Sequence, residues 1–315
     1  MANKILVADG FHPELFKELC AVDGLDVHPA AKVSQDELPS LLADVEGLVI
    51  RSATTVNESL LEAASNLKLV IRAGEGTDNI DKKLCEAKNV TVENTPGANN
   101  NSAAEHAVAL MLTVLRHTAT AHGTMIDGKW AKSNFMGNEL WKKKVGIVGF
   151  GRIGQIVAKR ISGFEPDAYF FDPFVKETEL NGAKKVESLE EIFKTCDIIT
   201  LHTPLMDATK GMVNSDLLNC MKSDAVLVNA SRGGIVDEAA LLTLLKDKKI
   251  RGAGFDVFAT EPLPEGDELR KLDNLIMTPH LGASTQEAQY RVGEMVIHQL
   301  KEFFTNNNVL NQVKA

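Results

Sequence analysis

Three glycines stand at a fixed spacing in the middle of the chain, at Gly149, Gly151 and Gly154. An apolar run from Val145 leads into the first of them, a helix-like run follows the third, and Asp172 ends the next apolar run. In such a strand–turn–helix unit the first glycine turns the chain, the second lets a pyrophosphate approach, and the third lets the helix pack closely. The spacing alone is weak evidence, but with the strand, helix and acid around it we predict a dinucleotide site.

The acidic residue predicts which dinucleotide binds. Asp172 can accept hydrogen bonds from the adenosine ribose hydroxyls, and its charge would repel a 2′-phosphate there. Pro173 follows it, and no arginine stands next to it to hold such a phosphate. We therefore expect NAD rather than NADP.

Three further side chains suit hydride chemistry on a hydroxy acid. Oxidation of C–OH to C=O needs a base for the hydroxyl proton, and histidine has the unperturbed pKa nearest neutrality. His280 follows an apolar run, Glu261 could hydrogen-bond its imidazole, and Arg232 could bind a substrate carboxylate. By residue type and position alone, each also has an ordinary interpretation as a structural histidine, a solvated loop glutamate or a turn-capping arginine.

Apolar runs alternate with helix-like segments along almost the whole chain, which is the rhythm of a parallel sheet. In residues 1–98 the expected strands are 4–8, 47–50, 68–71 and 90–92, with helices at 13–20, 36–43, 58–65 and 81–87. Six more strands are expected at 145–149, 168–172, 197–201, 225–229, 252–256 and 275–278. We predict an α/β protein of two doubly wound parallel-sheet domains, a flavodoxin-like substrate domain and a Rossmann-type NAD domain, with a cleft between them.

The expected domain boundaries follow from the last helix, at about 284–304, which is long enough to return to the first domain. We place the substrate domain at 1–98, completed by 288–315, and the NAD domain at 99–287. The tail at 309–313 is expected to extend the first sheet.

Ligands of doubly wound sheets bind outside the carboxyl ends of the strands. In the second domain, the expected cofactor contacts at and after those ends are Gly149, Gly151, Arg152, Ile153, Gly154, Asp172, Thr203, Ala230, Arg232, Asp256 and Gly282. In the first domain two strand ends carry cations, Arg51 beside Ser52 and Arg72 before Gly74. They predict a site for a small anion.

Composition limits the classes of partner. The chain has 315 residues, 44% of them hydrophobic and 24% charged, and a net charge of −9 that argues against nucleic acid or an anionic membrane. No stretch approaches the roughly 18 apolar residues of a membrane helix. The four cysteines form no C-x-x-C pair, so we expect free thiols in a reducing cytoplasm and no metal site.

These motifs together resemble the D-isomer-specific 2-hydroxyacid dehydrogenases over essentially the whole chain. The residues that carry the resemblance are Gly149-Phe-Gly-Arg-Ile-Gly154, Asp172-Pro173, His202-Thr-Pro204, Ala230-Ser-Arg232-Gly-Gly-Ile-Val-Asp-Glu238, Phe255-Asp-Val-Phe258, Glu261-Pro262 and Pro279-His-Leu-Gly282. The resemblance implies that the family's Arg, Glu and His catalytic set falls on Arg232, Glu261 and His280.

Within the family, motifs such as Arg51-Ser-Ala-Thr54, Asp78-Asn-Ile-Asp81 and Gly128-Lys-Trp130 most resemble members that oxidise 3-phosphoglycerate to 3-phosphohydroxypyruvate, the first step of serine synthesis. The resemblance then implies a small, phosphorylated 2-hydroxy acid held by Arg51, Ser52, Arg72 and Asn99 at the phosphate, and by Arg232 and the N–H groups near Gly74 and Gly76 at the carboxylate. Glu75 departs from the family pattern, in which a small or hydroxyl residue is usual. Reduction of hydroxypyruvate, glyoxylate or another 2-oxo acid, and an NAD-sensing interaction protein, remain alternatives.

The segment 102–115 is expected to be a buried helix, with Ser102 and Glu105 as a capping box. The resemblance implies a homodimer, or a dimer of dimers, built on this helix and the arm around Trp130, with Met111, Leu112 and Trp130 supplying apolar surface. Because the sequence ends at Ala315, we expect no regulatory domain and no serine-binding feedback site.

Overall fold

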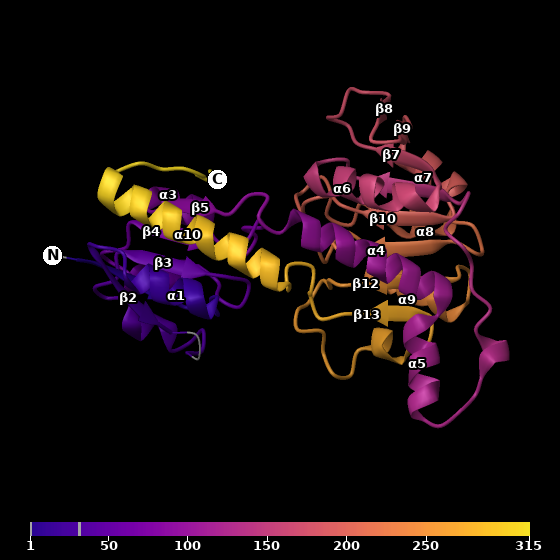
Figure 1. Ribbon diagram of the computed structural model, residues 1–315, viewed down its shortest axis with the longest axis horizontal. Coiled ribbons are helices and arrows are strands. Elements are labelled where there is room, and N and C mark those ends of the chain that lie inside the picture. Colours follow the sequence, from indigo (N-terminus) through magenta and orange to yellow (C-terminus); the bar gives the residue numbers. More distant parts are fainter. Residues whose placement is uncertain (1, 31–32) are drawn as a thin grey trace. The chain divides into compact units, whose positions relative to one another are not determined.

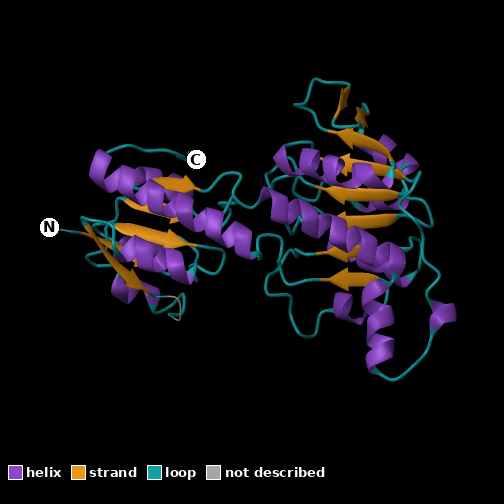
Figure 2. Cartoon of the chain, viewed as in Figure 1, coloured by secondary structure: helices purple, strands orange, loops and turns teal. Residues whose placement is uncertain are grey.

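The computed structural model describes residues 2–30 and 33–315. The chain divides into two compact units: unit 1 comprises Met1–Asn99 and Ala283–Ala315, and unit 2 comprises Asn100–Gly282. Both units are α/β layers in which helices flank a mainly parallel sheet (Figure 2). This confirms the predicted fold class.

Unit 1 is built on a five-stranded parallel sheet in the order β2-β1-β3-β4-β5. Its strands are β1 (Asn3–Val7), β2 (Leu25–Pro29), β3 (Gly47–Ile50), β4 (Leu69–Arg72) and β5 (Thr91–Asn94). Its helices are α1 (Pro13–Cys20), α2 (Glu58–Ala63), α3 (Lys82–Ala87), α10 (Gln286–Asn306) and the 3-10 turn η1 (Leu38–Leu41). This strand order is the flavodoxin-like one, in which ligands bind at the carboxyl ends of the strands.

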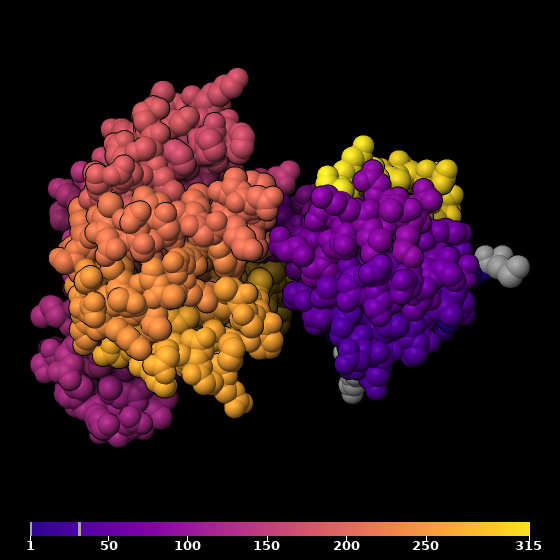
Figure 3. All heavy atoms as spheres, turned by 180° about the vertical axis from the view of Figure 1, so that it is seen from behind, coloured from indigo at the N-terminus to yellow at the C-terminus, as the bar shows by residue number. Residues whose placement is uncertain are grey.

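The last helix, α10, completes the core of unit 1. Val292, Val296 and Leu300 on α10 are buried in one apolar cluster with Ile5 and Val7 of β1. After α10 the tail forms an antiparallel bridge to β5 through Gln312, and the tail lies on the surface of unit 1 (Figure 3). The tail therefore extends the sheet edge, as the sequence predicted.

Unit 2 contains an eight-stranded sheet in the order β13-β12-β11-β10-β6-β7-β9-β8, shown in Figure 1. The strands are β6 (Lys144–Val148), β7 (Asp167–Phe171), β8 (Glu179–Leu180), β9 (Ala183–Lys185), β10 (Ile198–Leu201), β11 (Val226–Asn229), β12 (Gly252–Phe255) and β13 (Leu275–Met277). Only β8 is antiparallel to its neighbour. Because β6 lies between β7 and β10, the strand order reverses at its carboxyl end, where doubly wound sheets bind ligands.

Helices accompany this sheet in unit 2, and most of them flank it. They are α4 (Asn100–Arg116), α5 (Thr118–Ile126), α6 (Arg152–Ile161), α7 (Leu189–Thr195), α8 (Ser215–Asn219) and α9 (Glu238–Lys246), with 3-10 turns η2 (Lys132–Asn134), η3 (Ser162–Phe164) and η4 (Glu268–Lys271). The long helix α4 packs against β12 where the strand has small residues: a Cβ built on Gly254 would lie 3.2 Å from the Leu110 Cβ. Close helix–strand packing therefore explains a glycine in a buried strand.

Several sequence expectations were wrong in detail. The strand β2 and the pair β8–β9 were not predicted, and the segment expected as a helix at 36–43 forms only η1. Helix α4 begins at Asn100, so Ser102 lies inside its first turn and is not the N-cap. Met111 is fully buried in the core of unit 2 and supplies no surface for a partner. Among the described residues, no helix combines the length and apolar character needed to cross a membrane.

Candidate active site

The glycine turn has the geometry of a dinucleotide site. Gly149 has a φ of 86°, and a Cβ there would lie 2.6 Å from the His202 carbonyl oxygen. A Cβ on Gly151 would meet nothing within 4 Å, which leaves open space over the turn, whereas one on Gly154 would overlap the Gly149 carbonyl. The helix α6 starts at Arg152, directly after Gly151, and Gly154 lies in its first turn. Gly149 therefore makes the predicted turn and Gly154 the predicted close helix packing, and the open space at Gly151 is compatible with the predicted approach of a ligand.

Two side chains beside this turn fit the same ligand. The Asp172 carboxylate accepts the Phe150 N–H at 2.7 Å and the Phe174 N–H at 2.8 Å, which fixes it next to the turn. The Thr203 hydroxyl is buried and has no hydrogen-bond partner among the described residues. A buried polar group without a partner is costly, so this hydroxyl is suited to a bound ligand.

His280 and Glu261 form a hydrogen-bonded pair. His280 Nδ1 lies 2.7 Å from Glu261 Oε2, and Glu261 Oε1 accepts the Phe258 N–H at 3.0 Å. Burial acts to raise the pKa of Glu261, but the hydrogen bonds from His280 and Phe258 outweigh it and hold the pKa below its ordinary value. An ionised Glu261 requires a proton on Nδ1, so Nε2 is the ring nitrogen left to exchange a proton with a substrate.

Arg232 sits on a turn that is tied at its base by Asn229. The buried Asn229 amide accepts the N–H and hydroxyl of Ser231, at 3.1 and 2.8 Å, and donates to the Arg232 carbonyl at 2.9 Å. A Cβ on Gly233 would overlap the Phe258 carbonyl, so this turn packs directly on the segment that leads to Glu261. Sequence reasoning missed Asn229, although a polar residue ending a buried strand was a signal for it.

Glu238, at the start of α9, ends one of the motifs that carry the family resemblance, but the sequence assigned it no role. Its carboxylate accepts the Ala259 N–H at 2.6 Å and so orders the loop that carries Glu261. Burial is the main cause that raises the pKa of Glu238, with the nearby charges of Asp267 and Glu261 acting in the same direction. Arg232, Glu261 and the loop of His280 thus follow three neighbouring strands, β11, β12 and β13, at one edge of the sheet.

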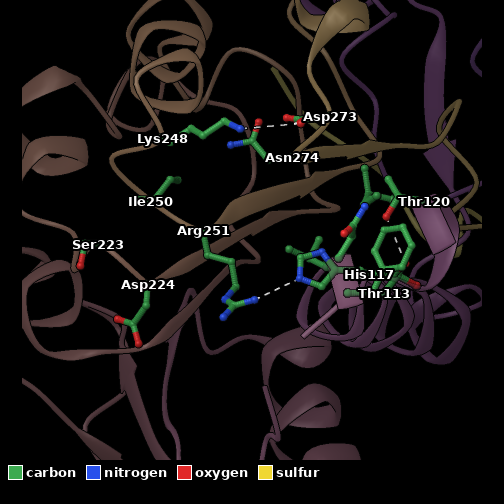
Figure 4. Close-up of a pocket in the computed structure, with 14 residues that line it drawn as sticks. Thr113, His117, Thr120, Ser223, Asp224, Lys248, Ile250, Arg251, Asp273 and Asn274 are labelled. Atoms are coloured by element: carbon green, nitrogen blue, oxygen red, sulfur yellow. Dashed lines mark hydrogen bonds and ion pairs between the residues drawn. The ribbon is translucent and has the colours of Figure 1, made fainter. Parts of the chain in front are cut away.

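Other reactive residue types in unit 2 are poorly suited to this chemistry. Burial lowers the pKa of His202 to about 4, so its imidazole is neutral at pH 7. Burial raises the pKa of the free Cys196 thiol to about 11, and the same holds for Cys85 in unit 1. A hollow of about 560 Å³ that includes His117 and Arg251 lies at the amino ends of β11, β12 and β13 (Figure 4). The hollow therefore lies at the opposite end of these strands from Arg232, Glu261 and His280, which follow their carboxyl ends.

In unit 1, the turn of Arg51 and Ser52 is locked from two sides. The Asp9 carboxylate accepts the N–H of Arg51 and both the N–H and hydroxyl of Thr54. The Asn79 amide donates to the carbonyls of Arg51 and Thr54, at 2.7 and 2.6 Å. The Arg51 guanidinium itself is hydrogen-bonded to no described residue, and burial lowers its pKa. A half-buried cation on a rigid turn is a site for an anion.

The second cationic strand end is that of β4, where Arg72 precedes Gly74. Here the structure distinguishes between the two N–H groups that were expected to bind the substrate carboxylate. The Arg72 side chain folds over Gly74, where a Cβ would overlap its guanidinium. The Gly74 N–H donates to the Arg72 carbonyl at 2.8 Å and is therefore engaged within the turn, whereas the Gly76 N–H makes no bond to any described residue. Gly76 is thus the better candidate of the two for a substrate carboxylate.

Two further residues of unit 1 bear on substrate binding: Asn99, which was predicted to contact the substrate, and Glu75, which departs from the family pattern. One Glu75 oxygen accepts the Gly97 N–H at 2.8 Å, which turns this carboxylate toward the backbone that follows β5. The Asn99 amide oxygen is buried and has no partner among the described residues. Because a flip of the amide group exchanges its oxygen and nitrogen, Asn99 can offer either a donor or an acceptor there.

Comparisons with known proteins agree with this geometry. The model of the family described as D-isomer specific 2-hydroxyacid dehydrogenase, NAD binding domain, matches residues 108–282. D-3-phosphoglycerate dehydrogenase of Methanocaldococcus jannaschii is 40% identical over 313 residues, which are 98% of this chain and 59% of that relative. The chain thus spans about three fifths of the length of that relative.

Two further relatives match over their full length. Hydroxypyruvate reductase of Thermotoga maritima is 40% identical over 301 residues, which are 94% of this chain and 97% of that protein. The structure of TT0316 protein from Thermus thermophilus has a TM-score of 0.90 at 30% identity and covers 98% of this chain and 99% of its own. The chain belongs to the family of D-isomer specific 2-hydroxyacid dehydrogenases, and residues 108–282 form its NAD-binding domain.

Proposed function

We propose that this chain oxidises a D-2-hydroxy acid to the 2-oxo acid, and catalyses the reverse reduction. The observation that carries the proposal is the His280–Glu261 pair, whose side chains are hydrogen-bonded at 2.7 Å. The turn of Arg232 packs against the segment that leads to Glu261, at the same carboxyl end of the sheet. When bound, the nicotinamide cofactor supplies the hydride acceptor. We further propose that NAD is preferred over NADP, because the Asp172 carboxylate beside the glycine turn would accept hydrogen bonds from the ribose hydroxyls and repel a 2′-phosphate. Equal dissociation constants for NADH and NADPH would contradict this.

The chain's own groups supply the rest of the chemistry. As the C2 hydride leaves, His280 Nε2 takes the hydroxyl proton, so that the C–H and O–H bonds break while the C=O bond forms. Glu261 holds the Nδ1 proton and stabilises the imidazolium that results. Arg232 donates charge-assisted hydrogen bonds to the substrate carboxylate or to the developing carbonyl. In the reduction the same proton returns from His280.

For the substrate we propose 3-phosphoglycerate, with 3-phosphohydroxypyruvate as its product. The support is the Arg51 turn: a half-buried guanidinium with no acceptor among the described residues, held in place by Asp9 and Asn79. Ser52 is exposed on the same turn, and the buried Asn99 amide oxygen has no partner in the part of the chain that the structure describes. A phosphate offers the acceptor oxygens that such donors require.

The test is a substrate panel measured with NADH. The panel contains 3-phosphohydroxypyruvate, hydroxypyruvate, glyoxylate, pyruvate and 2-oxoglutarate. Arg51→Gln should lower kcat/KM for the phosphorylated acid by roughly 10- to 150-fold, the worth of a charge-assisted bond of about 1.5–3 kcal/mol, and change the others much less. Lys68→Gln is the matched control, since Lys68 is a surface cation of unit 1 paired with Glu46. An equal loss for hydroxypyruvate would refute the phosphate role of Arg51.

A second candidate is the reduction of hydroxypyruvate or glyoxylate. The hydroxypyruvate reductase of Thermotoga maritima is as similar to this chain as the phosphoglycerate dehydrogenase is, and the chain covers 97% of it. Glu75, next to the predicted substrate residues, also adds negative charge that disfavours a phosphorylated acid. A kcat/KM for hydroxypyruvate at or above that for the phosphorylated acid would select this candidate. NADH binding without turnover on any 2-oxo acid would instead favour an interaction protein.

We also propose that the chain forms a homodimer through the arm that follows α4. Four large apolar side chains of this arm are strongly exposed: Met125, Ile126, Trp130 and Met136. Helix α5 stands out from the body of unit 2 (Figure 3), and exposed apolar area of this kind is typical of an interface. Light scattering at micromolar concentration should give twice the mass of 34.2 kDa, and Trp130→Glu should shift it toward the monomer. A monomeric native protein would contradict this.

A further inference from the structure

The loop that carries His280 has an unusual backbone. His280 has a φ of 54°, in the left-handed region that side-chain-bearing residues rarely adopt. A residue persists there only when its surroundings fix it, and such residues gather at functional sites. The structure shows what fixes this one. The His280 N–H donates to the Asp256 carbonyl at 2.8 Å, the Leu281 N–H to Asp256 Oδ1 at 2.7 Å, and the Gly282 N–H to Asp256 Oδ2 at 2.8 Å.

Asp256 can hold the loop only if its own carboxylate is held. The residue is 1% exposed, and a buried carboxylate is costly unless it is paired and hydrogen-bonded. Besides the two backbone N–H groups, Oδ1 accepts the Thr278 hydroxyl at 2.6 Å and lies 3.1 Å from His106 Nε2. In the described part of the chain, His106 is the one basic side chain within ion-pair distance of Asp256.

His106 reaches this point from a different element. It lies on α4, and its Nε2 is also 3.0 Å from the Thr278 hydroxyl oxygen. The same helix touches the loop directly, because a Cβ on Gly282 would lie 3.8 Å from Ala103. Thr278 donates its hydroxyl proton to Asp256, so Nε2 must carry the proton that faces both oxygens. The His106 Nε2–H on α4 therefore links this helix to Asp256, which follows β12, and to Thr278, which precedes the His280 loop.

We propose that His106 is a positioning residue for the proton-transfer loop: its Nε2–H fixes Asp256 and Thr278, and Asp256 in turn fixes the left-handed backbone at His280. The inference rests on the proposed dehydrogenase function, since it assigns His106 to that reaction. His106 itself exchanges no proton with substrate. Its contribution is geometric, and a displacement of about 1 Å at a reacting group can cost roughly a hundredfold in rate.

The experiment compares variants that keep or remove the Nε2 donor. His106→Gln keeps an N–H at nearly the same reach, and His106→Leu removes it with little change in volume. We expect His106→Leu to lower kcat by roughly 10- to 100-fold with KM for the 2-oxo acid changed less than about threefold, and His106→Gln to stay within about threefold of the native kcat. Loss of activity in His106→Gln equal to that in His106→Leu would overturn the proposal.

Amide hydrogen exchange provides a readout that does not depend on turnover. In the cofactor-free protein, exchange of the Leu281 and Gly282 amides should accelerate in His106→Leu and not in His106→Gln, while the α9 segment, residues 238–246, exchanges at the native rate. Unchanged exchange at 281 and 282 in His106→Leu would also overturn the proposal, even if the protein proves inactive on every 2-oxo acid. If His106→Leu does not fold, His106→Asn, whose amide is too short to reach Asp256, is measured in its place with the same two expectations.

Discussion

Two histidine–carboxylate pairs lie in unit 2, and they differ chiefly in burial. His280 and Glu261 are joined at 2.7 Å and are 38% and 35% exposed; His106 and Asp256 are joined at 3.1 Å and are 19% and 1% exposed. In both pairs burial acts to raise the carboxylate pKa and hydrogen bonds lower it by more, so both carboxylates are ionised at neutral pH. The same chemical pair therefore occurs once with both side chains about one third exposed and once with its carboxylate buried.

This difference separates proton transfer from positioning. An accessible imidazole whose second nitrogen is unbonded can take up and release a proton during a reaction. A carboxylate at 1% exposure has no such exchange, but it can organise backbone N–H groups, because hydrogen bonds to a buried charge are strong. The comparison predicts that changes in the exposed pair alter the rate with little effect on stability, whereas changes in the buried pair alter stability and loop geometry, and alter the rate through the loop.

The largest expected effect is at His280 itself. His280→Asn should lower kcat by roughly 10²–10⁴-fold, the usual contribution of a general acid–base, with little change in NADH binding or in the unfolding midpoint. Steady-state kinetics, NADH fluorescence titration and thermal unfolding measure the three quantities. The control is His28→Asn, since His28 pairs with Asp26 on the surface of unit 1 and should be silent. Native turnover in His280→Asn would remove the basis of the comparison.

Both members of the exposed pair were predictable from the sequence. Of the buried pair, only Asp256 was. His280, Glu261 and Asp256 all follow apolar runs that end in polar residues, and parallel strands bring such ends to one edge. His106 lies 150 positions before Asp256 in a helix whose composition only predicts burial. Nothing in a helical pattern says which partner a lone histidine contacts, so the sequence does not predict the pairing of His106 with Asp256.

The fold was predictable where hydrophobic runs are continuous. The strands β6 and β10 to β13 are almost wholly apolar, and their predicted positions differ from the structure by one residue or so. The strand β2 and the pair β8–β9, with the sequences LDVHP, EL and AKK, are short or polar and owe their state to a neighbouring edge. Long-range pairing of this kind leaves no local pattern. Similarly, the hydrogen bond from the Gly74 N–H to the Arg72 carbonyl depends on the local turn, which hydrophobic periodicity does not predict.

The next largest effect should come from the buried carboxylate. Asp256→Asn should lower the free energy of unfolding by about 1–3 kcal/mol at pH 7, because the amide presents a donor where N–H groups need an acceptor. The folded pKa of Asp256 lies below its ordinary value, so its stabilisation is present above about pH 4 and is lost as the pH falls through the folded pKa. In urea unfolding, the difference in the free energy of unfolding between Asp256→Asn and the native protein should therefore be smaller at pH 3.5 than at pH 7.

Glu261→Gln is the matched control for that measurement. Glu261 is about one third exposed, so solvent screening should keep its effect on unfolding well below that of Asp256→Asn. A larger loss of stability in Glu261→Gln than in Asp256→Asn would reverse the assignment of the two pairs.

The smallest effect is the most specific to the exposed pair, a shift in pH dependence. Reduction of a 2-oxo acid needs the imidazolium form of His280, and Glu261 stabilises that form through the 2.7 Å bond to Nδ1. Glutamine accepts the same hydrogen bond without the charge, so the alkaline limb of kcat/KM for reduction should move to lower pH by about one unit. Asp256→Asn should leave that limb in place while it lowers the plateau, since Asp256 touches the backbone of His280 and not its ring. Measuring both kcat/KM profiles with NADH from about pH 5.5 to about pH 9.5, a range that includes neutrality, decides the point. If both substitutions moved the limb equally, Asp256 would act on the proton of His280, and burial would not separate the two roles.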